Sequence, residues 1–162
     1  MASINVPYSG SAGASVARSD AKLVRHAHEA YELLHVAFVV APLVAGIDKF
    51  FHVLTNWDKY LAPQVASALP ASVSAHTFMG AVGVIEIIAA IIVLVRPRVG
   101  AYVVAAWLVG IIGNLVLTGG YLDVALRELG LFLGALALAR LSLEQDRHAR
   151  LEQNRIAASS KV

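Results

Sequence analysis

The sequence predicts an all-α integral membrane protein, a four-helix bundle with an extracytoplasmic amphipathic helix between its first two spans. Three observations indicate this fold class. Hydrophobic residues make up 58% of the chain and charged residues 15%, against roughly 45–50% and 25% in soluble globular domains. The chain contains four long apolar runs, each close to the ~20 residues that cross a bilayer as a helix. Its Lys and Arg residues also fall almost entirely on one side of the implied membrane.

The charge asymmetry sets the expected orientation. Ten of the thirteen Lys and Arg residues lie in the N-terminal stretch, the Arg96-Pro97-Arg98 turn and the C-terminal tail, which this topology places on one side. Lys59 lies in the opposite loop, and Lys49 and Arg127 fall inside apolar runs. Short loops rich in Lys and Arg stay cytoplasmic. We therefore expect a multi-pass protein with cytoplasmic N and C termini.

The two ends of the chain are expected to lie outside the membrane domain. Residues 1–28 are predicted to form an N-terminal cytoplasmic segment, and residues 1–19 show no apolar period and no pattern of a cleaved signal peptide. From Asp20 to Leu34, apolar residues recur at helical spacing, which indicates an interfacial helix leading into the first span. Residues 142–162 are predicted to form a charged cytoplasmic C-terminal tail, helical but with too few apolar residues for a full stripe.

The four-span membrane domain is expected to cover residues 29–141. Its first span is predicted from Leu33 to Leu54 and contains Pro42, which removes a backbone donor and predicts a kink. Tight turns follow the second and third spans, so neighbouring helices are expected to be antiparallel. The remaining spans are predicted at residues 76–95, 99–118 and 121–141.

The loop between the first two spans, residues 55–74, is long for a helical bundle. Its aromatic and apolar residues recur at helical spacing: Trp57, Tyr60, Leu61, Val65 and Leu69. This spacing predicts one short amphipathic helix on the outer face of the membrane. Its role is either to anchor the loop or to act as a lid over an outward cavity.

Polar residues are expected to face the interior of the bundle in its outer half. Residues three and four apart share a helix face, and every span carries such a stripe with an ionisable or amide side chain. An unpaired charge within the bilayer costs about 2.5–3.5 kcal/mol even on a lenient scale, so these groups must be paired or functional. The candidate ligand-binding or polar-core residues are Asp48, Lys49, His52, Glu86, Asn114, Asp123 and Arg127.

Arg127 is predicted to be the central cation of this polar core. A guanidinium holds a carboxylate through two bonds, so the expected pairs are Arg127 with Asp48 or Glu86, and Lys49 with Asp123. Arg127 also precedes a GxxxG pattern at residues 130–134, typical of close helix contact. Three interpretations stay open: pairs that only hold the bundle together, a polar pocket open to the outside, and contact with another subunit.

The sequence predicts no cofactor. The chain has no cysteine, which excludes disulfides, iron–sulfur clusters and thiolate metal sites. His52 and His76 are both expected near the outer surface and could share a metal ion, but no third ligand has an obvious spacing, so we predict no metal site. His35 lies at the opposite end of its span, which separates it from His76 and argues against paired haem ligands. The basic residues are spread over three segments, so nucleic acid is not an expected partner.

Three motifs, taken in order, resemble those of DoxX-like membrane proteins. Gly46-Ile47-Asp48-Lys49 is similar to that family's Gly-x-x-Lys signature, and Gly83-Val84-Ile85-Glu86 resembles its Gly-x-x-Glu. Leu126-Arg127-Glu128-Leu129-Gly130 resembles the Arg-containing opening of its fourth span. The resemblance covers residues 33–141. It implies a four-helical protein of the bacterial cytoplasmic (inner) membrane, in a family that includes small subunits linked to quinone-dependent sulfur oxidation and partners in oxidative-stress complexes.

These observations favour a non-catalytic accessory or assembly subunit of a larger membrane complex, of the redox type that the resemblance implies. Its partners would be membrane lipid and other membrane protein subunits, with the two ends of the chain available for docking. The first alternative is a small-ligand or proton-coupled binding or transport protein that uses the outer polar pocket. The second is a quinone-linked oxidoreductase subunit, ranked last because no nucleophile and base pair is recognisable. Catalytic residues are therefore not assigned.

Overall fold

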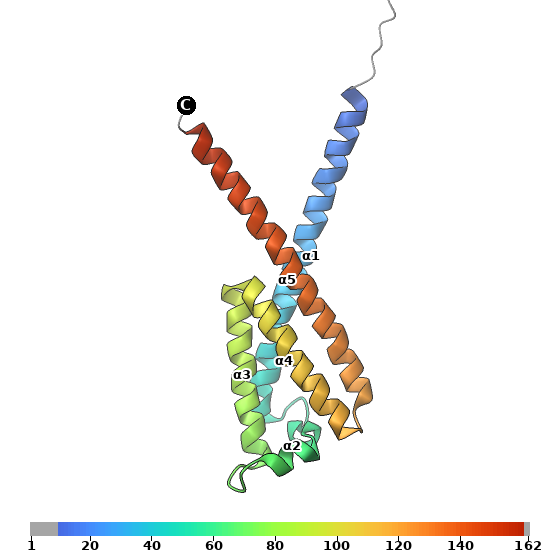
Figure 1. Ribbon diagram of the computed structural model, residues 1–162, viewed down its shortest axis with the longest axis vertical. Helices are drawn as coiled ribbons and strands as arrows, with labels where there is room; N and C mark the ends of the chain where they lie inside the picture. The colour runs from blue at the N-terminus through green and yellow to red at the C-terminus, as the bar shows by residue number, and fades with distance from the viewer. Residues whose placement is uncertain (1–9, 161–162) are drawn as a thin grey trace, which may run out of the picture.

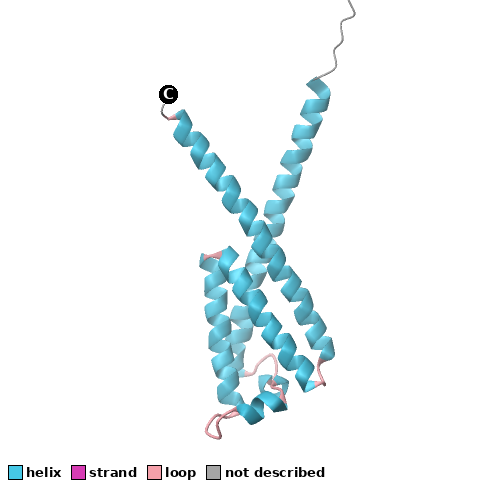
Figure 2. Cartoon of the chain, in the orientation of Figure 1, coloured by secondary structure: helices cyan, strands magenta, loops and turns pink. Residues whose placement is uncertain are grey.

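A computed structural model describes residues 10–160, and all regular structure in that range is helical (Figures 1 and 2). In chain order the helices are α1 (Gly10–Phe51), the 3-10 helix η1 (Trp57–Tyr60), α2 (Pro63–Ala68), α3 (Ala75–Val95), α4 (Pro97–Thr118) and α5 (Leu122–Ser159). The predicted all-α class is confirmed. The first nine residues of the predicted N-terminal segment, and Lys161 in the predicted tail, lie outside the described residues.

The four long helices pack into one body, from which two helical arms extend. Within the body α1 packs against α3, α3 against α4, and α4 against α5, while α5 also contacts α1. The helices α1 and α5 cross where Gln145 Nε2 lies 3.0 Å from His28 Nδ1, and beyond this point they diverge (Figure 1). Residues 10–27 are termed the α1 arm, and residues 147–160 the α5 arm. The loop that holds η1 and α2 lies at the opposite end of the body.

The apolar core lies where α1, α3, α4 and α5 meet below the crossing. Its largest fully buried side chains are Val93 and Leu138, and Phe38 of α1 packs among them. Much of the remaining core is alanine, which lets helix backbones approach closely. These small buried residues are Ala89, Ala101, Ala105, Ala135 and Ala139.

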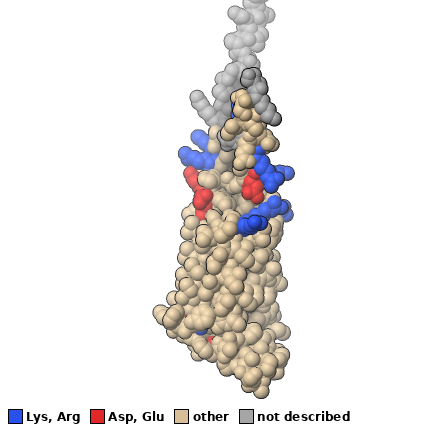
Figure 3. Space-filling view, turned by 90° about the vertical axis from the view of Figure 1, so that its left-hand side faces the viewer, with Lys and Arg blue, Asp and Glu red and all other residues tan. Residues whose placement is uncertain are grey.

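The outside of the body is apolar, as expected for a protein in lipid. Among the described residues, the segment Ser19–Phe51 and the helices α3 and α4 are long and apolar enough to cross a membrane. Ile88 and Ile91 on α3, and Val109 on α4, are each more than half exposed. In Figure 3 the charged residues gather where the arms leave the body, whereas the surface below them is almost free of charge. The chain is therefore a helical membrane protein.

Helices α3 and α4 lie where the sequence predicts the second and third spans. Helices α1 and α5 are longer than the predicted first and fourth spans. Helix α1 begins at Gly10 and continues through Pro42, so residues 10–19, which show no apolar period, are also helical. Helix α5 continues from Leu122 to Ser159. Neither helix is interrupted at the predicted domain boundaries after residues 28 and 141.

The prediction of a single amphipathic helix in the 55–74 loop is wrong, because the structure contains two short helices there. Helix η1 ends at Tyr60 and α2 begins at Pro63. The break follows from Pro63, since a residue that precedes proline is pushed out of the helical region. Ala62 accordingly has φ −63° and ψ 137°, and both Leu61 and Ala62 are buried.

Candidate functional site

A buried ion pair joins α1 to α3 near the loop end of the body. Lys49 Nζ lies 2.5 Å from Glu86 Oε2, and the two side chains are only 3% and 9% exposed. One turn earlier in each helix, Gly46 and Gly83 face each other. A Cβ on Gly46 would lie 2.7 Å from the Gly83 carbonyl oxygen, and a Cβ on Gly83 would lie 2.6 Å from that of Gly46. The paired glycines therefore bring the helices close enough for the ion pair to form.

Other side chains complete the surroundings of this pair. Lys49 Nζ lies 3.9 Å from the centre of the Trp57 ring, within the range of a cation–π contact. Glu128 of α5 is half-buried and interacts electrostatically with both Lys49 and Glu86. Trp107 of α4 lies close to the Glu86 carboxyl, although its buried indole N–H does not reach hydrogen-bonding geometry. All four long helices therefore contribute to one polar centre.

Asp48 terminates α1 and holds the loop that comes after it. Its carboxylate accepts hydrogen bonds from the backbone N–H groups of Val53 and Leu54, and from the indole N–H of Trp57 at 2.8 Å. His52, which directly follows the last residue of α1, adopts φ 54°. This is the left-handed conformation in which many helices end. Asp48 thus pairs with N–H groups of the loop that follows the helix, and it places Trp57 over Lys49.

Asn114 of α4 anchors the same loop from the other side. Its side-chain oxygen accepts a hydrogen bond from the N–H of Ala62 at 2.9 Å, and its side-chain nitrogen donates to the carbonyl of Tyr60 at 2.6 Å. The amide thereby pairs with two backbone groups at the break between η1 and α2. The sequence predicts Asn114 to lie with the charged core, but the structure gives it this loop-binding role.

The predicted pairing of Arg127 is wrong. Its guanidinium lies 3.7 Å from Asp123 of the preceding turn of α5, and the two side chains are 76% and 69% exposed. Arg127 therefore pairs with neither Asp48 nor Glu86, and Asp123 does not pair with Lys49. The reason is the rotation of α5, whose buried face includes Ala125. A residue two positions later lies roughly 200° further around the helix, on the opposite face.

The GxxxG pattern at residues 130–134 does not mark the close helix contact predicted from it. A Cβ on Gly130 would meet nothing within 4 Å, so the 130–134 pattern is not a close helix contact, whereas one on Gly134 would lie 3.2 Å from the ring of Phe38. In α4 the side facing the core contains Ala101, Ala105 and Leu108.

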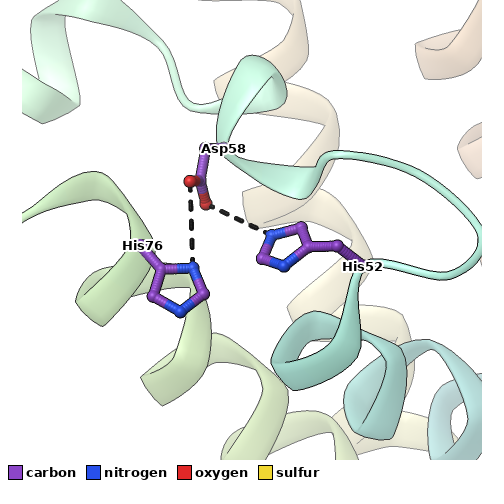
Figure 4. A group of neighbouring side chains, drawn as sticks. All are labelled: His52, Asp58 and His76. Carbon is purple, nitrogen blue, oxygen red and sulfur yellow. Dashed lines mark ion pairs between the residues drawn. The ribbon is translucent and has the colours of Figure 1, made fainter.

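A second cluster lies beside the polar centre, formed by His52, Asp58 and His76 (Figure 4). Asp58 Oδ1 lies 3.8 Å from His52 Nε2, and Asp58 Oδ2 lies 3.8 Å from His76 Nδ1. The two imidazole rings stack, with their centres 5.0 Å apart. The three residues come from the end of α1, from η1 and from the first turn of α3.

Trp57 and Asp58 belong to the site, although the sequence does not indicate them. Of the predicted candidates, the structure brings Asp48, Lys49 and Glu86 into one region, places His52 in the neighbouring cluster, and leaves Asp123 and Arg127 on the exposed face of α5. The positions of Trp57 and Asp58 depend on the turn that Asp48 caps, which leaves no periodic signal in the sequence.

Comparisons with protein-family models, with curated proteins and with solved structures find no significant match to this chain. The resemblance to DoxX-like proteins therefore stays a prediction from the sequence motifs. The function of the chain is inferred from those motifs and from the geometry of the described residues.

Proposed function

We propose that this chain is a non-catalytic accessory or assembly subunit of a larger complex in the bacterial cytoplasmic membrane, of the redox type that the DoxX resemblance implies. In this proposal α1, α3, α4 and α5 all cross the bilayer as a four-helix bundle. The arms are cytoplasmic and the loop with η1 and α2 is extracytoplasmic. The observation that carries the proposal is the pair of arms, which continue α1 and α5 well beyond the packed body.

The proposal that α5 is a fourth span is supported by its packing. The helix lies along α4 and also contacts α1. In the predicted span, residues 121–141, the charges lie near the two ends. Asp123 and Arg127 pair near the loop end, where long side chains can reach the membrane surface, and Arg140 is exposed near the crossing. Between Glu128 and Arg140 the helix has no charged residue.

The arms have the composition of docking elements rather than of membrane spans. Leu151 and Ile156 on the α5 arm are each 66% exposed, and Leu23 on the α1 arm is 67% exposed. Charged side chains of both signs lie near them, including the pair of Arg147 with Glu144 at the base of the α5 arm. Interfaces between subunits combine an apolar centre with a polar rim, and the arms offer both kinds of side chain.

The polar centre favours a structural role over ligand transport. Lys49 and Glu86 form an ion pair with each other, and the Trp57 ring makes a cation–π contact with the Lys49 ammonium group. Two surface depressions lie away from this pair, near the arms. One is lined by residues 140–147 of α5, and the other by residues of the α3–α4 turn together with Tyr31 and Ser142. The polar centre is therefore best explained as the feature that fixes how the helices pack.

Site-specific photocrosslinking in native membranes tests this function. A photoreactive amino acid at Leu151 or Ile156 is expected to form a discrete adduct with another membrane protein, identified by mass spectrometry. The matched control is the same substitution at Ile91, which is exposed on α3 within the apolar body and should give no such adduct. Arm positions that yield only free chain, or adducts only with a second copy of this chain, would contradict the accessory role.

A further inference from the structure

We propose that His52, Asp58 and His76 form a binding site for a divalent transition-metal ion of the zinc type, at the loop end of the protein. Metal binding here is independent of the accessory role. It departs from the sequence prediction of no metal site, which depends on His52 and His76 lacking a third ligand. Figure 4 shows Asp58 reaching toward both rings.

The spacing of the three side chains suits an ion. Their candidate ligand atoms all lie within 4.8 Å of one another, and Asp58 oxygens lie 3.8 Å from a nitrogen of each histidine. Zinc binds nitrogen and oxygen at about 2.0–2.2 Å. Two ligands of one ion are therefore about 3.3 Å apart in a tetrahedral arrangement and about 4.2 Å apart when opposite. The two Asp–His separations of 3.8 Å lie between these values and are too long for direct hydrogen bonds. The limit of 4.8 Å for the whole group exceeds them, so binding requires the two imidazole nitrogens to move closer together.

The second observation is that polar atoms facing this space have no hydrogen-bond partner. His52 Nε2 and Asp58 Oδ1 are both buried atoms without a hydrogen bond, although they lie 3.8 Å apart. Buried polar atoms are nearly always paired in folded proteins, and an exception requires an explanation. A cation between these two atoms would satisfy both, because imidazole nitrogen and carboxylate oxygen are ligands for zinc and related ions.

The surrounding structure holds two of the ligands in place. His52 is fixed at the end of α1 by the left-handed turn that Asp48 caps. The backbone N–H of Asp58 donates a hydrogen bond of 3.0 Å to the side-chain oxygen of Asn56, and Asn56 is the N-cap residue of η1. His76 is the adjustable member, because its side chain is 59% exposed in the first turn of α3. The exposed position of His76 leaves the site accessible to an ion from the surface.

Two imidazoles and one carboxylate also indicate the class of ion. Calcium and magnesium prefer oxygen ligands alone, whereas two histidines favour zinc, cobalt, nickel or copper. Three protein ligands leave a further position open on the ion, as in zinc sites that bind water or a small ligand. The bound ion would also connect the end of α1, η1 and the start of α3.

Zinc titration of the full chain tests the site. The protein is purified in detergent with an affinity tag that contains no histidine, freed of metal with a chelator, and titrated with Zn²⁺ against a chromogenic competitor. One saturable ion per chain is expected. His76→Gln and Asp58→Asn should each weaken binding by at least about tenfold, since even outer-shell substitutions cost about 10–100-fold. His26→Gln is the matched control, because His26 lies on the α1 arm beside Glu29.

Thermal unfolding provides a second measurement. Zn²⁺ should raise the melting temperature of the wild type and of His26→Gln, because an ion that binds only the folded state stabilises it. It should not raise the melting temperature of His76→Gln or Asp58→Asn. His76 is largely exposed, so its variant is expected to fold normally. An absence of saturable binding to the wild type, or equal affinity in His76→Gln, Asp58→Asn and the wild type, would overturn the proposal and leave the cluster as a simple His–Asp pair.

Discussion

Breaking the ion pair between Lys49 and Glu86 should destabilise the protein far more than breaking the pair between Asp123 and Arg127. In Lys49→Met the ammonium group is lost but the chain length is kept, so Glu86 stays buried with no cation beside it. Removing one partner of a buried pair typically costs about 3–5 kcal/mol. The exposures of 3% and 9% put this pair in the buried class.

The pair on α5 is the matched control. Arg127 and Asp123 are 76% and 69% exposed, and exposed pairs one turn apart contribute only about 0.3–0.5 kcal/mol. Arg127→Leu should therefore change the free energy of unfolding by less than about 1 kcal/mol. This reverses the expectation from the sequence alone, in which Arg127 is the central cation of the polar core.

The double variant Lys49→Met with Glu86→Leu separates the ion pair from simple packing. Replacing both charges with apolar residues of similar size is often neutral or stabilising. The cation–π contact of Lys49 with Trp57 is lost as well, and such contacts are worth about 2 kcal/mol when desolvated. The double variant should therefore unfold within about 2 kcal/mol of the wild type and be clearly more stable than Lys49→Met.

The measurement is reversible unfolding by sodium dodecyl sulfate in mixed micelles, followed by far-ultraviolet circular dichroism. Tryptophan fluorescence is less suitable, because Trp57 contacts the substituted residue directly. Equal unfolding free energies for Lys49→Met and Arg127→Leu would refute the assignment of a buried pair. A double variant no more stable than Lys49→Met would show that the loss comes from packing rather than from an orphaned charge.

Three further predictions concern the helix contact, the loop and the topology. Gly83→Ala should cost about 1–3 kcal/mol through overpacking, because its Cβ would lie 2.6 Å from a facing carbonyl oxygen; Gly130→Ala meets nothing within 4 Å and should be neutral or stabilising in the same unfolding assay. Asn114→Ala removes both hydrogen bonds that hold the loop, so limited proteolysis should cleave within residues 55–74 faster than in the wild type. Single cysteines at Ser67 and Ser159 should label oppositely with a membrane-impermeant reagent in intact cells, and labelling of both would contradict the proposed topology.

The apolar helices were predictable because their ends are set by local chemistry. Helix α4 begins with Pro97 at its first position, where proline fits a helix without loss of a hydrogen bond. It ends at Gly119 with φ 72°, a conformation that glycine adopts without strain. Signals of this kind act over a few residues, so the sequence alone located α3 and α4 to within two residues at each end.

The rotation of α5 was not predictable, because its sequence offers two faces with small residues. One contains Gly130 and Gly134 together with Arg127, and the other contains Ala125 and Ala135. Both would allow close packing. The structure buries the alanines, which pack against neighbouring helices, and leaves the arginine exposed. The choice depends on contacts with α1 and α4, and no local pattern in α5 specifies it.

The candidate site was predictable only in part, since it combines helix geometry with a loop whose path depends on tertiary contacts. Adjacent residues on a helix point about 100° apart, so Lys49 can face α3 while Asp48 faces the loop. Asp48 then draws Trp57 back over Lys49, and Asp58, the next residue, reaches His52 and His76. A single capped turn thus connects the buried ion pair to the proposed metal ligands. Loss of order in this turn would disturb both sites at once, whereas loss of the metal ligands should leave the ion pair intact, because Glu86 and Lys49 contact each other through the helices alone.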